Sequence, residues 1–145
     1  MNNTRAKIII CIFLAVATFC IYWQVKDHEF TNWDDTIHCC VDIYAAGLTS
    51  ENVKWAFTTS TTGHWAPMTF LSHLLDFQLY GLNAKGHHLT NVGMHIVNSL
   101  ILFIVLSRMT GKLWQSAFVA SMFAFHPINV ESVAWAAERK NVLST

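Results

Sequence analysis

The feature that most constrains this chain is an apolar run from Ile8 to Val25, which contains no charged residue. A helix of these 18 residues is close to the length that crosses the hydrocarbon core of a bilayer. Tyr22 and Trp23 close the run, as aromatic side chains do at a membrane interface. A cleaved signal peptide is the alternative, but the run does not end in small residues at the spacing of a cleavage site. We therefore predict a retained transmembrane helix.

The composition also favours a membrane protein. Hydrophobic residues make up 53% of the chain and charged residues 12%, against about 25% charged residues in an average soluble protein. Nine basic residues balance nine acidic residues, so no basic surface predicts nucleic-acid binding. The four cysteines include no C-x-x-C spacing, which argues against a thiolate zinc site.

Two further apolar segments, Leu89–Leu106 and Leu113–Trp135, predict a second and a third transmembrane helix. The tight connection between them, residues 107–112, carries two basic residues and no acid. Residues 1–7 likewise carry two basic residues and no acid. By the positive-inside rule, both segments are predicted to lie in the cytoplasm.

The fold class that follows is an all-α membrane protein of about three transmembrane helices, with a large and partly helical first extracytoplasmic loop. The predicted segments are a cytoplasmic N-terminus (1–7), a first transmembrane helix (8–25), an extracytoplasmic loop (26–88), a second transmembrane helix (89–106), a cytoplasmic turn (107–112), a third transmembrane helix with a broken outer end (113–135) and an outer segment (136–145).

The long outer loop contains two predicted helices. Ser50 is a candidate N-cap and Glu51 an early acid for the first of them. Pro67 suits the first turn of the second helix, apolar residues then recur at helical spacing, and Gly81 ends the run. This second helix either lies flat in the membrane interface or covers a small core of the loop itself.

Polar side chains form a stripe along the second predicted span. His88, Asn91, His95 and Asn98 are separated by steps of three, four and three, so they share one face of a helix. Because polar side chains are disfavoured in lipid, this face should turn toward other helices or a wet cavity. Hydrogen bonding between helices and ligation of a haem or a metal are the two interpretations.

The third predicted span is interrupted by a proline. Pro127 disfavours the helical conformation at His126, so the regular helix should stop near Phe125. The chain would then cross its remaining membrane depth with irregular backbone, which is tolerated only inside protein or beside a water-filled cavity. Polar His126, Asn129 and Glu131 at this depth predict a site.

Charged side chains on the predicted outer face are candidates for chemistry. Asp34 and Asp35 are adjacent carboxylates close to the first span. They would coordinate a divalent cation or accept a proton from an acceptor hydroxyl. Glu138, Arg139 and Lys140 follow the third span, where the positive-inside rule does not place a basic pair. The pair either binds an anionic group, such as a lipid-linked phosphate, or pairs with Glu138 or with lipid head groups.

The order of the motifs resembles one family. The motifs are Asn32-Trp-Asp-Asp35, His64-Trp-Ala-Pro-Met68, Leu71-Ser-His-Leu-Leu-Asp76, Gly81-Leu-Asn83, Gly86-His-His-Leu-Thr-Asn91, His126-Pro-Ile-Asn-Val-Glu-Ser-Val-Ala-Trp135 and Ala137-Glu-Arg-Lys-Asn-Val-Leu-Ser144. From about Phe30 to the last residue, the chain resembles the transmembrane and tetratricopeptide-repeat (TPR) glycosyltransferase-like family, a GT-C-type group related to protein O-mannosyltransferases.

The resemblance implies an enzyme with many membrane helices followed by TPR repeats. Such an enzyme moves a sugar from a polyprenyl- or dolichyl-phosphate carrier to a protein hydroxyl outside the cytoplasm. Its partners are the bilayer, the lipid-linked sugar and an acceptor protein, in a bacterial plasma membrane or an endoplasmic reticulum. No 34-residue repeat is present in this sequence. We therefore expect the N-terminal part of a longer enzyme, inactive by itself; the alternative is a non-catalytic membrane assembly or interaction module.

The family's acidic motif falls on Asp34 and Asp35, which the resemblance implies to be catalytic. The other implied roles are binding of the donor phosphate by His126, Arg139 and Lys140, and orientation of the acceptor or of a metal by Glu131 and Glu138. No cofactor is fixed by these motifs, and participation of a divalent cation stays open. The sequence departs from the family at Asn141, where the pattern has Asp.

Overall fold

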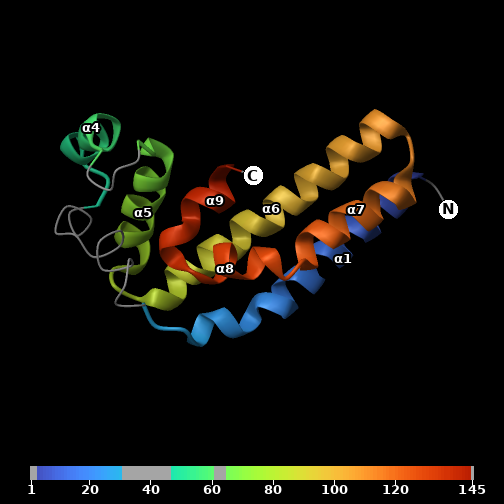
Figure 1. Ribbon diagram of the computed structural model, residues 1–145, viewed down its shortest axis with the longest axis horizontal. Helices are drawn as coiled ribbons and strands as arrows, with labels where there is room; N and C mark the ends of the chain where they lie inside the picture. The colour runs from blue at the N-terminus through green and yellow to red at the C-terminus, as the bar shows by residue number, and fades with distance from the viewer. Residues whose placement is uncertain (1–2, 31–46, 61–64, 145) are drawn as a thin grey trace.

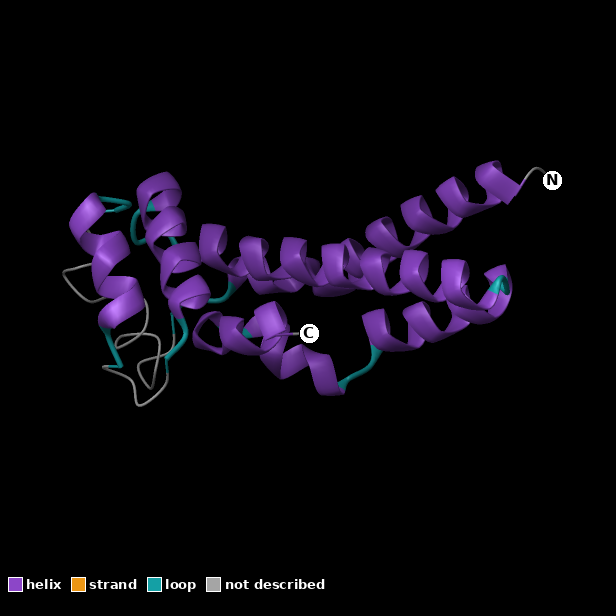
Figure 2. Cartoon of the chain, turned by 90° about the horizontal axis from the view of Figure 1, so that it is seen from above, coloured by secondary structure: helices purple, strands orange, loops and turns teal. Residues whose placement is uncertain are grey.

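The computed structural model describes residues 3–30, 47–60 and 65–144. Within these ranges all regular structure is helical, as predicted (Figures 1 and 2). The elements are α1 (Asn3–Tyr22), η1 (Trp23–Asp27), α4 (Ser50–Thr58), α5 (Pro67–Tyr80), α6 (Ala84–Thr110), α7 (Leu113–Phe125), α8 (Ile128–Ala134), η2 (Ala136–Glu138) and α9 (Arg139–Ser144). The predicted catalytic acids, Asp34 and Asp35, lie outside the described residues.

Helices α1, α6 and α7 pack lengthwise into a bundle (Figure 1). Leu14, Phe103 and Ala120 form part of its core, each at most 1% exposed. Large apolar side chains also cover the outside of the bundle, among them Phe13 at 60% and Phe118 at 67% exposure. A bundle that is apolar both inside and outside is suited to a lipid environment.

Two helices are long and apolar enough to cross a membrane, namely Asn3–Asp27 with 25 residues and Ala84–Thr110 with 27 residues. They correspond to the first two predicted spans. The third predicted span, Leu113–Trp135, is not one continuous helix, because α7 has only 13 residues. A helix of that length spans about 20 Å, which is shorter than the hydrocarbon core.

The break in the third span falls where Pro127 predicts it, because α7 ends at Phe125 and His126 is extended. The prediction of irregular backbone beyond this point was wrong, since the chain refolds at once into α8. Pro127 has helical backbone angles, and Nδ1 of His126 accepts a hydrogen bond of 3.2 Å from the backbone N–H of Ile128. That bond satisfies one of the N–H groups that a helix start leaves without a partner.

The two ends of the molecule differ in character. The N-terminus and the α6–α7 turn lie at one end, as the prediction of a shared membrane side requires (Figure 1). The opposite part consists of η1, α4, α5, α8, η2, α9 and the first turns of α6, and we call it the head. Helix α5 runs across the bundle rather than along it (Figure 2). Which end faces the cytoplasm remains a prediction.

Helices α4 and α5 enclose a small core of the head. Phe70, Leu74 and Phe77 of α5 pack with Ala56 of α4 and Ala136 of η2. This packing agrees with the second interpretation of α5, a helix that covers the core of the loop.

The ends of α4 and α5 lie close to their predicted positions. Pro67 occupies the first turn of α5, and Gly81 ends the helix with a φ of +58°. The N-cap of α4 is Thr49 rather than Ser50, because the Thr49 hydroxyl accepts the backbone N–H of Asn52 at 3.1 Å.

The polar stripe of α6 hydrogen-bonds to other helices. The side-chain amide of Asn91 donates to the carbonyl of Trp135 at 3.0 Å, and the imidazole Nε2 of His95 lies 3.1 Å from the carbonyl of Ala124. These carbonyls sit at the C-terminal ends of α8 and α7, where helical partners run out. Side chains of the stripe therefore hydrogen-bond to carbonyl groups at the ends of α7 and α8, as the interpretation of hydrogen bonding between helices predicts.

Candidate functional site

The centre of the head is a buried ion pair between Asp76 of α5 and Arg139 at the start of α9. Nη2 of Arg139 lies 2.6 Å from Oδ2 of Asp76, and the two side chains are 0% and 3% exposed. The pair joins an outer helix of the head to the last helix of the chain, which approach each other beside α6. A buried charge needs a partner of this kind, because desolvation of an isolated ion is costly.

The remaining polar atoms of the pair also have partners. Nε of Arg139 donates to Oδ1 of Asn91 at 2.7 Å, Nη2 donates to the carbonyl of His87 at 3.0 Å, and Nη1 lies 3.5 Å from the hydroxyl of Ser72. On the other side, the hydroxyl of Thr90 donates to Oδ1 of Asp76 at 3.0 Å. The guanidinium is therefore held by two helices, α5 and α6, in the interior of the head, whereas it was expected to bind a donor phosphate.

Adjacent Lys140 is placed very differently from Arg139. Neighbouring residues of a helix point about 100° apart, so Arg139 turns inward while the Lys140 side chain is 41% exposed. Nζ of Lys140 lies 3.4 Å from Oε1 of Glu138. The side-chain amide of Asn141 donates to the other oxygen of the same carboxylate. Glu138 is thus flanked by a cation and an amide, and Asn141 supplies a hydrogen-bond donor that an ionised Asp would lack.

One pocket of the head is lined by two glutamates, two histidines and a tryptophan, together with two aliphatic residues. It has a volume of about 380 Å³ and is lined by His28, Glu29, His88, Val130, Glu131, Ala134 and Trp135. We call it the Glu131 pocket. The rings of His28 and His88 meet edge to face with centroids 6.1 Å apart. Two carboxylates beside an aromatic wall provide acceptors for hydroxyl groups and an apolar surface for a ring.

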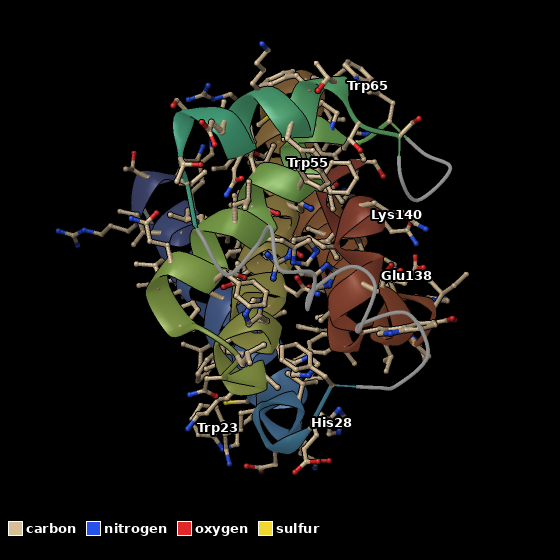
Figure 3. All side chains as sticks on the ribbon, turned by 90° about the vertical axis from the view of Figure 1, so that its left-hand side faces the viewer. Trp23, His28, Trp55, Trp65, Glu138 and Lys140 are labelled. Atoms are coloured by element: carbon tan, nitrogen blue, oxygen red, sulfur yellow. The ribbon has the colours of Figure 1, made fainter. Side chains whose placement is uncertain are left out.

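A second pocket lies on the α4–α5 side of the head. It has a volume of about 610 Å³ and is lined by Phe57, Trp65, Ala66, Pro67, Met68, Thr69, Lys140, Asn141, Leu143 and Ser144. We call it the Trp65 pocket. The indole N–H of Trp65 donates to the carbonyl of Phe57 at 3.0 Å, which fixes the ring across the end of α4. In Figure 3, Lys140, Glu138 and His28 follow one another along the same side of the head.

The structure does not bring the three expected phosphate-binding residues into one pocket. Lys140 lines the Trp65 pocket, Arg139 lies in the interior, and His126 lines a separate pocket of about 170 Å³ with apolar neighbours such as Phe125. The reason is the break at Pro127, because α8 and η2 lie between His126 and the start of α9, where Arg139 and Lys140 follow. Among the described residues, no group of three His, Cys, Asp or Glu side chains is arranged to hold a metal ion.

Comparison with curated proteins finds relatives that share one name, protein O-mannosyl-transferase. Protein O-mannosyl-transferase Tmtc2 of Drosophila melanogaster is 26% identical over 133 residues, covering 86% of this chain and 14% of the relative. Tmtc1 of the same organism is 30% identical over 82 residues, covering 57% and 10%. TMTC1 of Mus musculus is 34% identical over 87 residues, covering 58% and 9%. The chain is similar in sequence to protein O-mannosyl-transferases.

This finding confirms the family resemblance that the motifs predict. The chain spans about a tenth of the length of these protein O-mannosyl-transferases. No family model matches it, and no solved structure matches it.

Reasoning from the sequence missed the partners of Arg139. Asp76, His87 and Asn91 lie within the motifs that carry the resemblance to the protein O-mannosyl-transferases, yet none of them was assigned to the buried ion pair. One signal was available for Asp76. It falls on the same face of α5 as His73 and Phe77, where the apolar pattern predicts burial. A buried acid on a helix face predicts a buried cation somewhere else in the chain.

Proposed function

We propose that this chain is part of a membrane glycosyltransferase that moves a mannosyl group from a polyprenyl-phosphate carrier to a protein hydroxyl on the extracytoplasmic side. The observation that carries the proposal is the similarity to protein O-mannosyl-transferases, which extends over as much as 86% of the chain. The names of these relatives specify mannose as the sugar and a protein oxygen as the acceptor, and we extend both to this chain.

The architecture of the chain supports a reaction at a membrane surface. Two membrane-length helices carry the head at one end of the bundle, and the outside of the bundle is apolar. A lipid-linked donor keeps its chain in the bilayer and presents its phosphate and sugar at the interface. The head is therefore the part of the chain that meets the reacting groups. We propose that it lies on the extracytoplasmic side, with the N-terminus in the cytoplasm.

We assign the reaction centre to the surroundings of the Glu131 pocket. His28 and Glu29 line this pocket, and the next residue, Phe30, lies against the ring of His88 with centroids 6.3 Å apart. Asp34 follows Phe30 by four residues, and four fully extended residues span at most about 14 Å. This short connection supports a catalytic role for the Asp34–Asp35 pair beside Glu131.

The proposed mechanism is a single inverting displacement. A carboxylate of Asp34 or Asp35 accepts the proton of the acceptor hydroxyl, while that oxygen attacks the anomeric carbon of the sugar. The bond from the anomeric carbon to the phosphate oxygen breaks, and its electron pair leaves with the lipid phosphate. Lys140, whose ammonium group is partly exposed beside Glu138, stabilises the charge that grows on the phosphate. Glu131 and Glu138 orient the acceptor.

The test is transfer of labelled mannose from a lipid-linked donor to an acceptor peptide in membranes that contain the complete reading frame. Replacement of the aspartate that acts as the base, by Asp34→Asn or by Asp35→Asn, should lower kcat by at least about a hundredfold, the usual contribution of a general base. Asp27→Asn is the matched control, because Asp27 is an exposed acid of the head paired with Lys26 at 2.7 Å. Unchanged transfer in both Asp34 and Asp35 variants would show that the catalytic assignment is wrong.

A further inference from the structure

We infer that Asp76 and Arg139 are positioning residues, and that their ion pair sets the placement of α9 relative to the segment that leads into Asp34 and Asp35. The kinetic part of this inference rests on the proposed function, whereas the structural part does not. The inference changes the role of Arg139 from a ligand of the donor phosphate to an internal fixing point. It also assigns a role to Asp76, which has none in the expected site.

The first step is the fixing of α9. Arg139 is the first residue of this helix and stands between Glu138 and Lys140 in the sequence. Its guanidinium contacts Asp76 of α5 and Asn91 of α6, at 2.6 Å and 2.7 Å. A side chain held from two helices in the interior fixes the backbone that carries it. The orientations of Glu138 and Lys140 on the surface therefore follow from a contact inside the head.

The second step leads from the ion pair to Phe30 through His87. The carbonyl oxygen of His87 accepts a hydrogen bond from Nη2 of Arg139 at 3.0 Å. The imidazole Nδ1 of His87 lies 3.7 Å from Oδ2 of Asp76. The Nε2 atom of His87 lies 3.0 Å from the carbonyl oxygen of Gly81, and this hydrogen bond fixes the orientation of the ring. Phe30 packs edge to face on this ring with centroids 5.3 Å apart. Phe30, four residues before Asp34, therefore packs on a histidine that also contacts both members of the ion pair.

The third step is the energetic signature of a buried pair. Removing one partner leaves an uncompensated charge in the interior, which is strongly destabilising, whereas removing both charges is far less costly. The effects of substitutions at Asp76 and Arg139 on stability should therefore not be additive. Each single variant should lose stability, and the double variant should regain most of it. A phosphate ligand behaves otherwise. Loss of Arg139 would then be equally harmful with or without Asp76, and Asp76→Asn would free the guanidinium to bind the donor.

The experiment measures the placement of α9 by disulfide cross-linking. Met68 of α5 and Leu143 of α9 line the same Trp65 pocket, and both are replaced by Cys in a full chain whose native cysteines are changed to Ser. Asp76→Asn and Arg139→Gln should each lower the cross-link yield by about tenfold, and the double variant should return to within about twofold of the parent. Asp27→Asn, an exposed acid of the same head, is the control and should leave the yield unchanged.

The outcomes separate the two roles even if a single variant fails to fold. A double variant that folds and cross-links where the singles do not supports the inference. A double variant as damaged as Arg139→Gln overturns it, and so does full cross-linking in Asp76→Asn.

Kinetics give a second and independent readout. Asp76→Asn should lower kcat with little change in KM for the lipid-linked donor, since a positioning residue does not touch the phosphate. A raised KM with unchanged kcat would contradict the inference. If no transfer is found in any form of the protein, the proposed function fails, and the cross-link yields still decide the positioning role.

Discussion

Asn98 in the middle of α6 donates its side-chain amide to the carbonyl oxygen of Val142 in α9, at a distance of 2.6 Å. Val142 lies in α9 and is buried. Asn98 also lines a mainly apolar pocket with Ile101, Leu102, Val105 and Phe123. One side-chain amide thus joins α9 to the middle of an apolar helix that is long enough to cross a membrane.

Replacing Asn98 by Leu should destabilise the chain by about 1 kcal/mol, because the carbonyl of Val142 loses its donor in apolar surroundings. The free energy of unfolding is measured by denaturant titration in lipid-detergent mixtures. Val97→Leu is the control, since Val97 is 53% exposed on the same helix and should tolerate the change. Equal stability of the Asn98 variant and the control would show that the hydrogen bond contributes nothing.

The local features of the fold were predictable because they depend on neighbouring residues. Pro127 predicts the end of α7 through its own ring, and Gly81 predicts the end of α5 through its freedom at positive φ. The stripe at Asn91 and His95 predicts contacts between helices, since spacing alone places these residues on one face. The refolding into α8 was missed because the capping bond of His126 depends on a side-chain orientation that spacing does not reveal.

The ion pair at the centre of the head was not predictable in the same way. Arg139 was expected to bind a phosphate, because two adjacent basic residues, Arg139 and Lys140, indicate an exposed basic pair. A helix turns about 100° between neighbours, so one of two adjacent basic residues can be buried while the other is exposed. Which of them is buried depends on the distant carboxylate of Asp76, and no local pattern connects the two. The roles that the sequence assigns to the site residues therefore stay predictions, and the structure adds the arrangement of Arg139 with Asp76.

Gly86 is required by the close approach of Tyr80. A Cβ atom at Gly86 would lie 2.3 Å from Cγ of Tyr80, so the ring would have to move. Gly86→Ala should therefore destabilise the chain by about 1–3 kcal/mol, the usual cost of overpacking. Gly93→Ala is the matched control on the same helix, because nothing lies within 4 Å of its added Cβ.

Calorimetry or thermal unfolding in detergent measures both Gly variants. Gly93→Ala should stabilise the helix by up to about 1 kcal/mol, since Ala has the higher helix propensity. Combining Gly86→Ala with Tyr80→Ala should recover part of the loss. A Gly86→Ala variant as stable as Gly93→Ala would contradict the close approach of the ring.

His126 should contribute to stability as the side chain that caps α8. His126→Ala removes the acceptor of the Ile128 N–H and should cost about 1 kcal/mol in the free energy of unfolding. His126→Asn should restore most of this loss, because an Asn side chain accepts the N–H two residues later in an Asx turn. If donor binding falls equally in both variants while stability recovers in the Asn variant, the imidazole has the phosphate-binding role that the sequence implies.

The orientation of the head can be tested by cysteine labelling in intact cells. Ser50→Cys places a thiol at the start of α4 in the head, and Thr110→Cys places one at the end of α6 beside the turn. Both positions are exposed. With the native cysteines replaced, a membrane-impermeant maleimide should label Ser50→Cys from outside and label Thr110→Cys only after permeabilisation.

The labelling result bears directly on the chemistry, because the head carries the Glu131 pocket and the Asp76–Arg139 pair. Labelling of Ser50→Cys from outside puts these groups on the side where the proposed transfer takes place. The reverse pattern would place them in the cytoplasm and rule out an extracytoplasmic reaction at this site. Labelling of both thiols from outside would contradict the prediction that the two long helices cross the membrane, since the N-terminal end and the head would then share one side of it.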